Sequence, residues 1–119
     1  GGSVKAGGSL TLSCKVSAFA DSIRCLAWFR QASGKDRDFI AALHTGRHNT
    51  YYDDDVKGRV TVSLDSTGAI VSLQVNTLEP ADSGMYYCAF VYGYYNKPCA
   101  RASSEYEYWG QGTQVTVSS

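Results

Sequence analysis

Apolar and polar residues alternate along several short stretches of the chain, and this alternation predicts β-strands. In residues 9–16 the apolar positions are Leu10, Leu12, Cys14 and Val16, each separated from the next by a polar residue. Because successive side chains of a strand point to opposite faces, one face of this strand is apolar and the other is solvated. The same period recurs at Val60, Val62 and Leu64, at Val71, Leu73 and Val75, and at Val115 and Val117. Short strands separated by Gly, Pro, Asp and Ser predict an antiparallel sandwich or barrel.

Length and composition support a single all-β domain. The chain has 119 residues, which is enough for one hydrophobic core and too few for two. Nine Tyr and twelve Gly, against one Met and two Pro, favour strands joined by tight turns over helices. No internal repeat or linker interrupts the sequence, so we expect residues 1–119 to form one domain.

The charge balance and the apolar runs exclude several kinds of partner. Eleven Lys and Arg balance eleven Asp and Glu, so no basic field is available to attract nucleic acid. No apolar run approaches the roughly 20 residues that span a bilayer, and no basic and apolar leader precedes Gly1. We therefore expect neither a nucleic acid nor a membrane as partner. We also expect a secreted, extracellular protein whose signal peptide has been removed.

The four cysteines indicate disulfides. Cys14, Cys25, Cys88 and Cys99 form an even set in a short chain, which is typical of proteins from an oxidising compartment. Zinc binding is the alternative interpretation, but no two of these cysteines have the C-x-x-C spacing that zinc sites use. Disulfides are therefore the favoured prediction.

Other residues that could carry chemistry do not complete a motif. His44 and His48 lie close together without an evident third metal ligand, and Asp53, Asp54 and Asp55 are interpreted as a solvated turn and not as a calcium site. Ser, His and Asp are all present, but the sequence has no nucleophile elbow, no H-E-x-x-H and no Gly-rich phosphate loop. We expect no metal, no cofactor and no enzymatic activity.

The order of Cys, Trp and Tyr along the chain points to a particular sandwich. Cys14 is followed by Trp28 and then by Cys88, with Tyr86 two residues before the second cysteine. In such a sandwich the Trp packs on an inter-sheet disulfide, here Cys14–Cys88, and the Tyr hydroxyl anchors a corner. Over essentially its whole length the sequence resembles an immunoglobulin variable domain, and residues 109–119 are similar to a heavy-chain joining segment. That family has several residues before the position of Gly1, so we expect its first edge strand to be truncated here.

The stretch after Trp28 resembles that of camelid single-domain antibodies, the VHH domains or nanobodies. If Trp28 points into the core, Phe29 points to the opposite face, where a conventional heavy domain receives its light chain. Asp36 and Arg37 put two charges on that face, and burying them unpaired would cost several kcal/mol. We therefore expect no light chain and a monomeric domain. The predicted former light-chain face comprises Phe29, Asp36, Arg37, Phe39 and Trp109.

The resemblance implies that function lies in three hypervariable loops, at about residues 18–26, 43–50 and 91–108. Camel-type VHH domains tie the first of these loops to the third, which implies a second disulfide between Cys25 and Cys99. The third loop is rich in Tyr, a residue that offers a large contact area with few torsions to freeze. The residues expected to contact a protein antigen are Asp21, Ser22, Arg24, His44, Thr45, Arg47, His48, Asn49, Tyr92, Tyr94, Tyr95, Asn96, Lys97, Arg101 and Tyr106.

Two alternatives stay open at this stage. Tyr106 and Tyr108 could instead fold over the former light-chain face near Phe29. A variable-type domain of a cell-surface receptor shares the sandwich, and it is disfavoured by the joining-type residues 109–119 and by the charges on this face. The mildly basic tip of the third loop favours an acidic epitope, and this charge complementarity would affect the rate of association more than the affinity.

Arg59 and Asp82 resemble an internal ion pair of the family.

Overall fold

A computed structural model describes residues 2–16 and 22–119, so the predicted contact residue Asp21 lies outside the described residues. Ten strands and two short 3-10 turns account for the regular structure of this described part. The strands are β1 (Gly2–Lys5), β2 (Leu10–Lys15), β3 (Arg24–Gln31), β4 (Arg37–His44), β5 (Asn49–Tyr52), β6 (Val60–Leu64), β7 (Ile70–Val75), β8 (Gly84–Tyr92), β9 (Tyr108–Trp109) and β10 (Thr113–Ser118). The 3-10 turns are η1 (Pro80–Asp82) and η2 (Ser103–Glu105).

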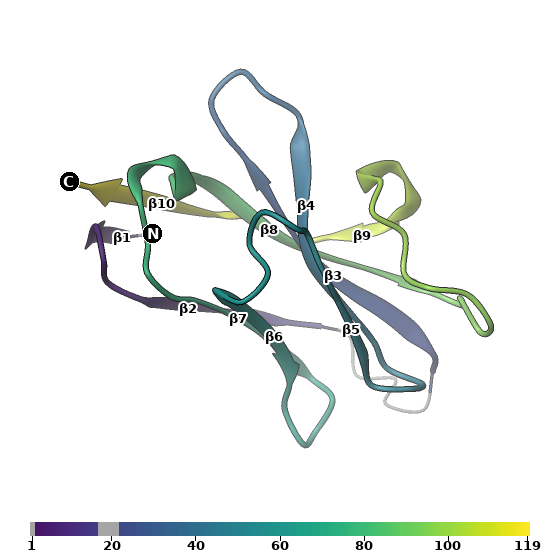
Figure 1. The fold of residues 1–119 in the computed structure, drawn as a ribbon. Helices are drawn as coiled ribbons and strands as arrows, with labels where there is room; N and C mark the ends of the chain where they lie inside the picture. Colours follow the sequence, from purple (N-terminus) through teal and green to yellow (C-terminus); the bar gives the residue numbers. More distant parts are fainter. Residues whose placement is uncertain (1, 17–21) are drawn as a thin grey trace.

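The strands form two sheets that pack as a sandwich (Figure 1). The larger sheet has the order β1-β10-β8-β3-β4-β5, with β9 also paired to β8, and the smaller sheet has the order β2-β7-β6. The pairs are antiparallel except for β1 and β10, which run parallel. The predicted all-β sandwich is confirmed. The edge strand β1 was not predicted, because Val4 is the only large apolar residue in it and a single residue gives no alternation.

The alternating residues of the small sheet line up in rows that face the large sheet. The register aligns three such rows, Leu10–Val75–Val60, Leu12–Leu73–Val62 and Cys14–Val71–Leu64. Val115 and Val117 of β10 meet these rows from the large sheet in the same buried cluster. Trp28 and Cys88 belong to this cluster as well, and Cys14 and Cys88 form the predicted inter-sheet disulfide. If the register shifted by one residue, these side chains would point toward solvent. Burial of the core therefore fixes the register of the paired strands.

Strand β3 is buried on both of its faces. Its residues from Arg24 to Phe29 are all buried, in contrast to the half-buried pattern of β2. Leu26 and Trp28 face the inter-sheet core, whereas Cys25, Ala27 and Phe29 belong to a separate cluster on the outer face of the large sheet. A sheet with one wet face would leave that second set exposed. Another part of the chain must therefore cover the outer face.

A corner near η1 is fixed by a buried tyrosine and an ion pair. The Tyr86 hydroxyl donates a hydrogen bond to the Asp82 carbonyl oxygen at 2.5 Å. The Asp82 carboxylate accepts two bonds from the Arg59 guanidinium, at 3.0 and 3.1 Å, which confirms the predicted pair. The backbone N–H of Glu79 donates to the same carboxylate at 2.9 Å. Burial, and secondarily the Asp82 charge, raises the pKa of Tyr86 to about 12.

We predict that Tyr86→Phe lowers the free energy of unfolding by about 1 kcal/mol at neutral pH, because the buried Asp82 carbonyl loses its donor. The raised pKa adds a pH dependence. Folding favours the neutral phenol, so this contribution is complete below the unfolded pKa of 10.0 and is lost as the pH rises through about 12. In urea titrations, the amount by which the free energy of unfolding of the wild type exceeds that of the variant should therefore shrink over that interval. An excess that grew as the pH rose would contradict the prediction.

Candidate functional site

The loops predicted to carry function meet at one end of the sandwich. The β4–β5 turn and the long connection from β8 to β9 lie at the end opposite the chain termini (Figure 1). This follows from the register, which pairs Arg24 at the start of β3 with Tyr92 at the end of β8, and Cys25 with His44 at the end of β4. The candidate site is therefore built on the ends of the three central strands of the large sheet.

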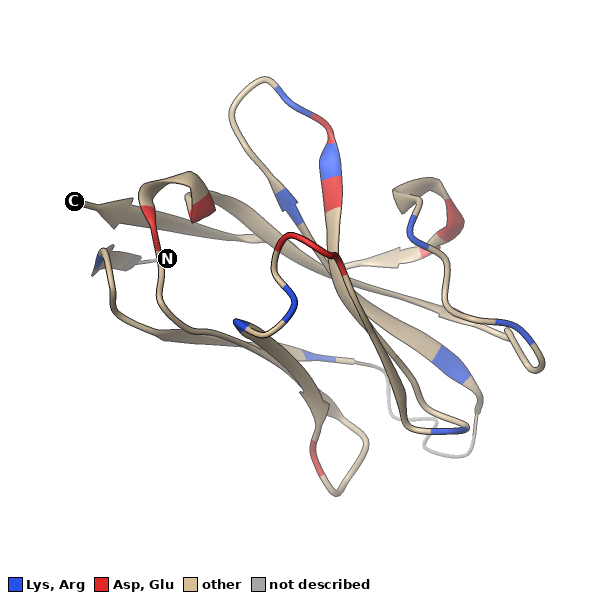
Figure 2. Ribbon diagram, viewed as in Figure 1, with Lys and Arg blue, Asp and Glu red and all other residues tan. Residues whose placement is uncertain are grey.

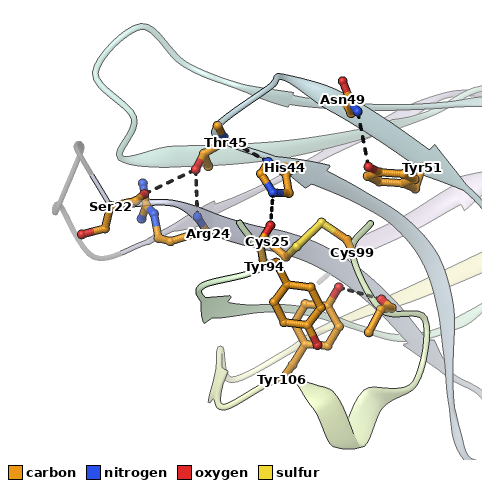
Figure 3. The surroundings of a disulfide bond; sticks show 12 residues. Ser22, Arg24, Cys25, His44, Thr45, Asn49, Tyr51, Tyr94, Cys99 and Tyr106 are labelled. Carbon is orange, nitrogen blue, oxygen red and sulfur yellow. Dashed lines mark hydrogen bonds between the residues drawn. A yellow bond between two sulfur atoms is a disulfide. The ribbon is translucent and has the colours of Figure 1, made fainter. Parts of the chain in front are cut away.

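Hydrogen bonds join the bases of these loops to one another (Figure 3). Thr45 bonds to Arg24 twice, through its amide to the Arg24 carbonyl and through its hydroxyl oxygen to the Arg24 amide, both at 2.9 Å. The Gly93 amide donates to the Ile23 carbonyl at 2.9 Å. The His44 ring lies 2.6 Å from the Tyr94 carbonyl oxygen through Nε2. These hydrogen bonds thus link the bases of all three loops to one another.

The second predicted disulfide, Cys25–Cys99, is present and joins β3 to the third loop. Cys25 is fully buried and Cys99 is nearly so, and both belong to the cluster on the outer face of the large sheet. No free cysteine occurs among the residues that the structure describes. The disulfide therefore holds the returning arm of the third loop, residues 99–106, against the sheet.

This returning arm covers the predicted former light-chain face. Tyr106 is 5% exposed, and its ring packs edge-on against fully buried Phe29 with the ring centroids 5.4 Å apart. Phe39 and Trp109 also surround Phe29, at centroid distances of 5.9 and 5.2 Å. Two hydrogen bonds hold the arm, one from the Tyr106 hydroxyl to the Ala100 carbonyl and one from the Trp109 Nε1 to the Tyr106 carbonyl. Burial raises the pKa of Tyr106, as expected for a phenol taken out of water.

The charges predicted on this face lie around the covered centre. Asp36 is exposed, and the Arg37 guanidinium stacks over Tyr87 and Trp109, at 4.0 and 4.5 Å from the ring centroids. Arg101 lies over Phe39 at 4.9 Å and donates a hydrogen bond to the Tyr52 carbonyl at 3.3 Å. Each cation remains solvated on one side while its planar group packs on an aromatic ring, which avoids the cost of burying it.

Comparison with known families agrees with this geometry. The sequence profile of the family described as Immunoglobulin V-set domain matches residues 2–118. The chain belongs to the immunoglobulin V-set family. Domains of this family are typically binding modules without enzymatic activity.

Within residues 2–16 and 22–119, no group of three or more His, Cys, Asp or Glu is arranged to hold a metal ion. In the same part of the V-set domain, no helix is long and apolar enough to cross a membrane.

Three of the predicted contact residues are buried in the V-set domain, and their assignment to direct contact is corrected. Arg24 is 1% exposed, because its guanidinium turns toward the smaller sheet and donates to the Gly68 carbonyl at 3.3 Å. His44 is 2% exposed between the second and third loops. Tyr106 covers Phe29, as its alternative role proposed. A side chain so enclosed has no surface to offer a partner.

Tyr108 differs from its expected role as a cover of the former light-chain face. Its neighbour Trp109 packs on Phe29, so Tyr108 points to the opposite side of β9. There its ring stacks on Phe90 at 4.7 Å and meets Tyr92 edge-on at 5.7 Å, and it remains 42% exposed. This aromatic group lies at the edge of the large sheet and was not predicted.

The other predicted contact residues divide by exposure. Ser22, Thr45, Tyr92 and Tyr94 are half-buried, and the exposed ones are Arg47, His48, Asn49, Tyr95, Asn96, Lys97 and Arg101. Tyr95 is 70% exposed, and the Lys97 ammonium lies 4.5 Å from the Tyr94 ring centroid. Figure 2 shows Lys and Arg at the β4–β5 turn and near the tip of the third loop, and one basic and one acidic segment on the returning arm. Contact with an antigen stays a prediction for these residues.

We predict that replacing Cys25 and Cys99 together by Ala leaves a folded domain that is less stable by about 3 kcal/mol. The estimate is the chain entropy regained when a loop on the order of 20 residues is opened while Cys14–Cys88 stays closed. Denaturant unfolding of the two proteins measures the difference. Thiol titration of the unmodified protein, unfolded without reductant, should find no reactive thiol, and two reactive thiols would contradict the prediction.

We predict that Tyr106→Ala lowers the free energy of unfolding by about 3 kcal/mol or more, since it opens a cavity over Phe29. The variant should also bind more of a dye that reports exposed apolar surface. Tyr95→Ala is the matched control, because Tyr95 lies in the same loop and is 70% exposed, and its effect should stay within about 0.5 kcal/mol. Equal losses in the two variants would contradict the covering role of Tyr106.

Proposed function

We propose that this V-set domain is the variable domain of a camelid heavy-chain-only antibody and that it binds a protein antigen as a monomer, without a light chain. The covering of Phe29 by the third loop carries the proposal. A V-set domain that paired through this face would need the face free of its own chain. Here the disulfide Cys25–Cys99 and the packing of Tyr106 keep the third loop on it.

The same covering argues against a receptor domain that pairs through this face. The joining-type residues 109–119 noted in the sequence add support for an antibody. Two disulfides require an oxidising compartment, which supports secretion to the extracellular space.

The proposed binding surface combines the β4–β5 turn with the tip of the third loop, residues 94–97. It presents Arg47, His48, Tyr95 and Lys97 to solvent from a frame that the disulfide and the loop-to-loop hydrogen bonds hold in place. A rigid frame lowers the entropy lost on binding, and exposed Tyr supplies contact area at a low entropic cost. These properties suit recognition of a protein surface.

Affinity capture with three immobilised forms of the domain tests the function. They are the unmodified protein, a tip variant with Arg47→Ala, Tyr95→Ala and Lys97→Ala, and a control with Lys35→Ala in the turn at the far end. We expect a protein antigen to be retained from mixtures of candidate antigens by the unmodified form and the control, and at least tenfold less by the tip variant. Each substitution removes an exposed side chain, so the fold should be unaffected.

Two results would contradict the proposal. Equal retention by all three forms would move binding away from the loop end. Light-chain variable domains are included in the mixtures, and their retention by the unmodified form would contradict binding without a light chain.

A further inference from the structure

His44 has the partners of a residue that positions a loop. It is the last residue of β4 and is 2% exposed, whereas Arg47 and His48 in the turn that follows are exposed. Its register partner is Cys25, so its side chain lies on the same face of the sheet as the disulfide Cys25–Cys99. From there the ring reaches across to the third loop (Figure 3).

The two ring nitrogens of His44 have partners of opposite kind. Nδ1 accepts a hydrogen bond from the Gly46 amide at 3.2 Å, and Nε2 faces the Tyr94 carbonyl oxygen at 2.6 Å. An amide N–H only donates and a carbonyl only accepts, so both contacts are satisfied by the neutral ring with its proton on Nε2. In that form Nε2–H donates to Tyr94. His44 thus bonds to its own turn with one nitrogen and to the third loop with the other.

The Tyr94 carbonyl lies where the third loop turns sharply. Gly93 and Tyr94 have φ angles of 100° and 63°, which are both left-handed, and for a tyrosine this conformation costs on the order of 1–3 kcal/mol. Such a residue keeps its conformation only when its surroundings hold it. The Gly93 amide is held by Ile23, and the Tyr94 carbonyl is held by His44. Residues 95–97 leave the sheet directly after this turn.

We infer that His44 is a positioning residue that fixes the tip of the third loop on the second loop, so that both present one continuous binding surface. That this surface binds an antigen rests on the proposed function; the positioning itself does not. The disulfide holds the tip on its far side at Cys99, and the hydrogen bond from His44 holds it on its near side at Tyr94. The exposed residues between these two points are then held at both ends.

Nitrogen-15 relaxation of the free domain tests the inference, with the order parameters of the amides of residues 95–97 as the readout. We expect values of about 0.85, typical of a rigid backbone, in the unmodified protein. In His44→Gln the side-chain amide reaches as far as Nε2 and can still donate to Tyr94, so the order should be kept. In His44→Asn the shorter side chain reaches only as far as Nδ1, and in His44→Phe no donor remains. Both variants should fall below about 0.6 at the tip.

His48→Asn is the matched control, because it replaces an exposed histidine of the same turn with a residue that tolerates the left-handed backbone there. Tip order unchanged in both His44→Asn and His44→Phe would show that the disulfide and loop packing suffice, and would overturn the inference. Loss of order in His44→Gln equal to that in His44→Phe would show that a donor in the place of Nε2 does not hold the tip, and would also overturn the inference.

A long-range proton–nitrogen correlation spectrum of the unmodified protein gives a measurement that needs no variant. It should show the His44 proton on Nε2, and a proton on Nδ1 of the neutral ring would contradict the hydrogen bonds described. Because all these measurements use the free domain, failure of the capture experiment and failure of this inference are distinguishable.

Discussion

The burial of β3 on both faces is the constraint on which the rest of the structure depends. An extended strand sends alternate side chains to opposite sides, and the small sheet can cover only one of them. Trp28 is covered by that sheet, while Phe29, its neighbour, is fully buried by the third loop. The third loop is therefore part of the packed structure, and the outer cluster of Cys25, Phe29, Cys99 and Tyr106 is a second small core.

The loop end acts as one body because its contacts run between loops and not only within them. Thr45 pairs with Arg24, Gly93 with Ile23, and Tyr94 with His44, while the disulfide Cys25–Cys99 crosses the same region. Each bond adds a modest free energy on its own, but together they leave the chain few ways to rearrange independently. Order at the loop end is what a binding surface needs if little entropy is to be lost when a partner arrives.

Sequence patterns predicted the parts of the fold that alternate, and the resemblance to a known family implied both disulfide pairings, but neither located residues whose burial depends on distant partners. The strands around Leu12, Val62 and Leu73 follow a period of two, since one face packs and the other is wet. Arg24 and His44 are polar residues near loops, and their burial depends on carbonyl groups of Gly68 and Tyr94, far along the chain. Neighbouring residues give no sign of such partners, so a contact role was the natural expectation for both.

Tyr106 gives the third loop a structural role besides the proposed binding role. In the antibody domain proposed above, the segment that carries the binding surface also supplies the ring that keeps Phe29 out of water. Any variant of the third loop on this framework must therefore keep an aromatic or similarly bulky residue where Tyr106 lies, and a cysteine where Cys99 lies. Fewer of its positions are free to vary than its length suggests. If the loop were transplanted into another V-set framework, Tyr106 would lose the surface of β3 on which it packs. The third loop and the strand beneath it therefore have to be transferred together.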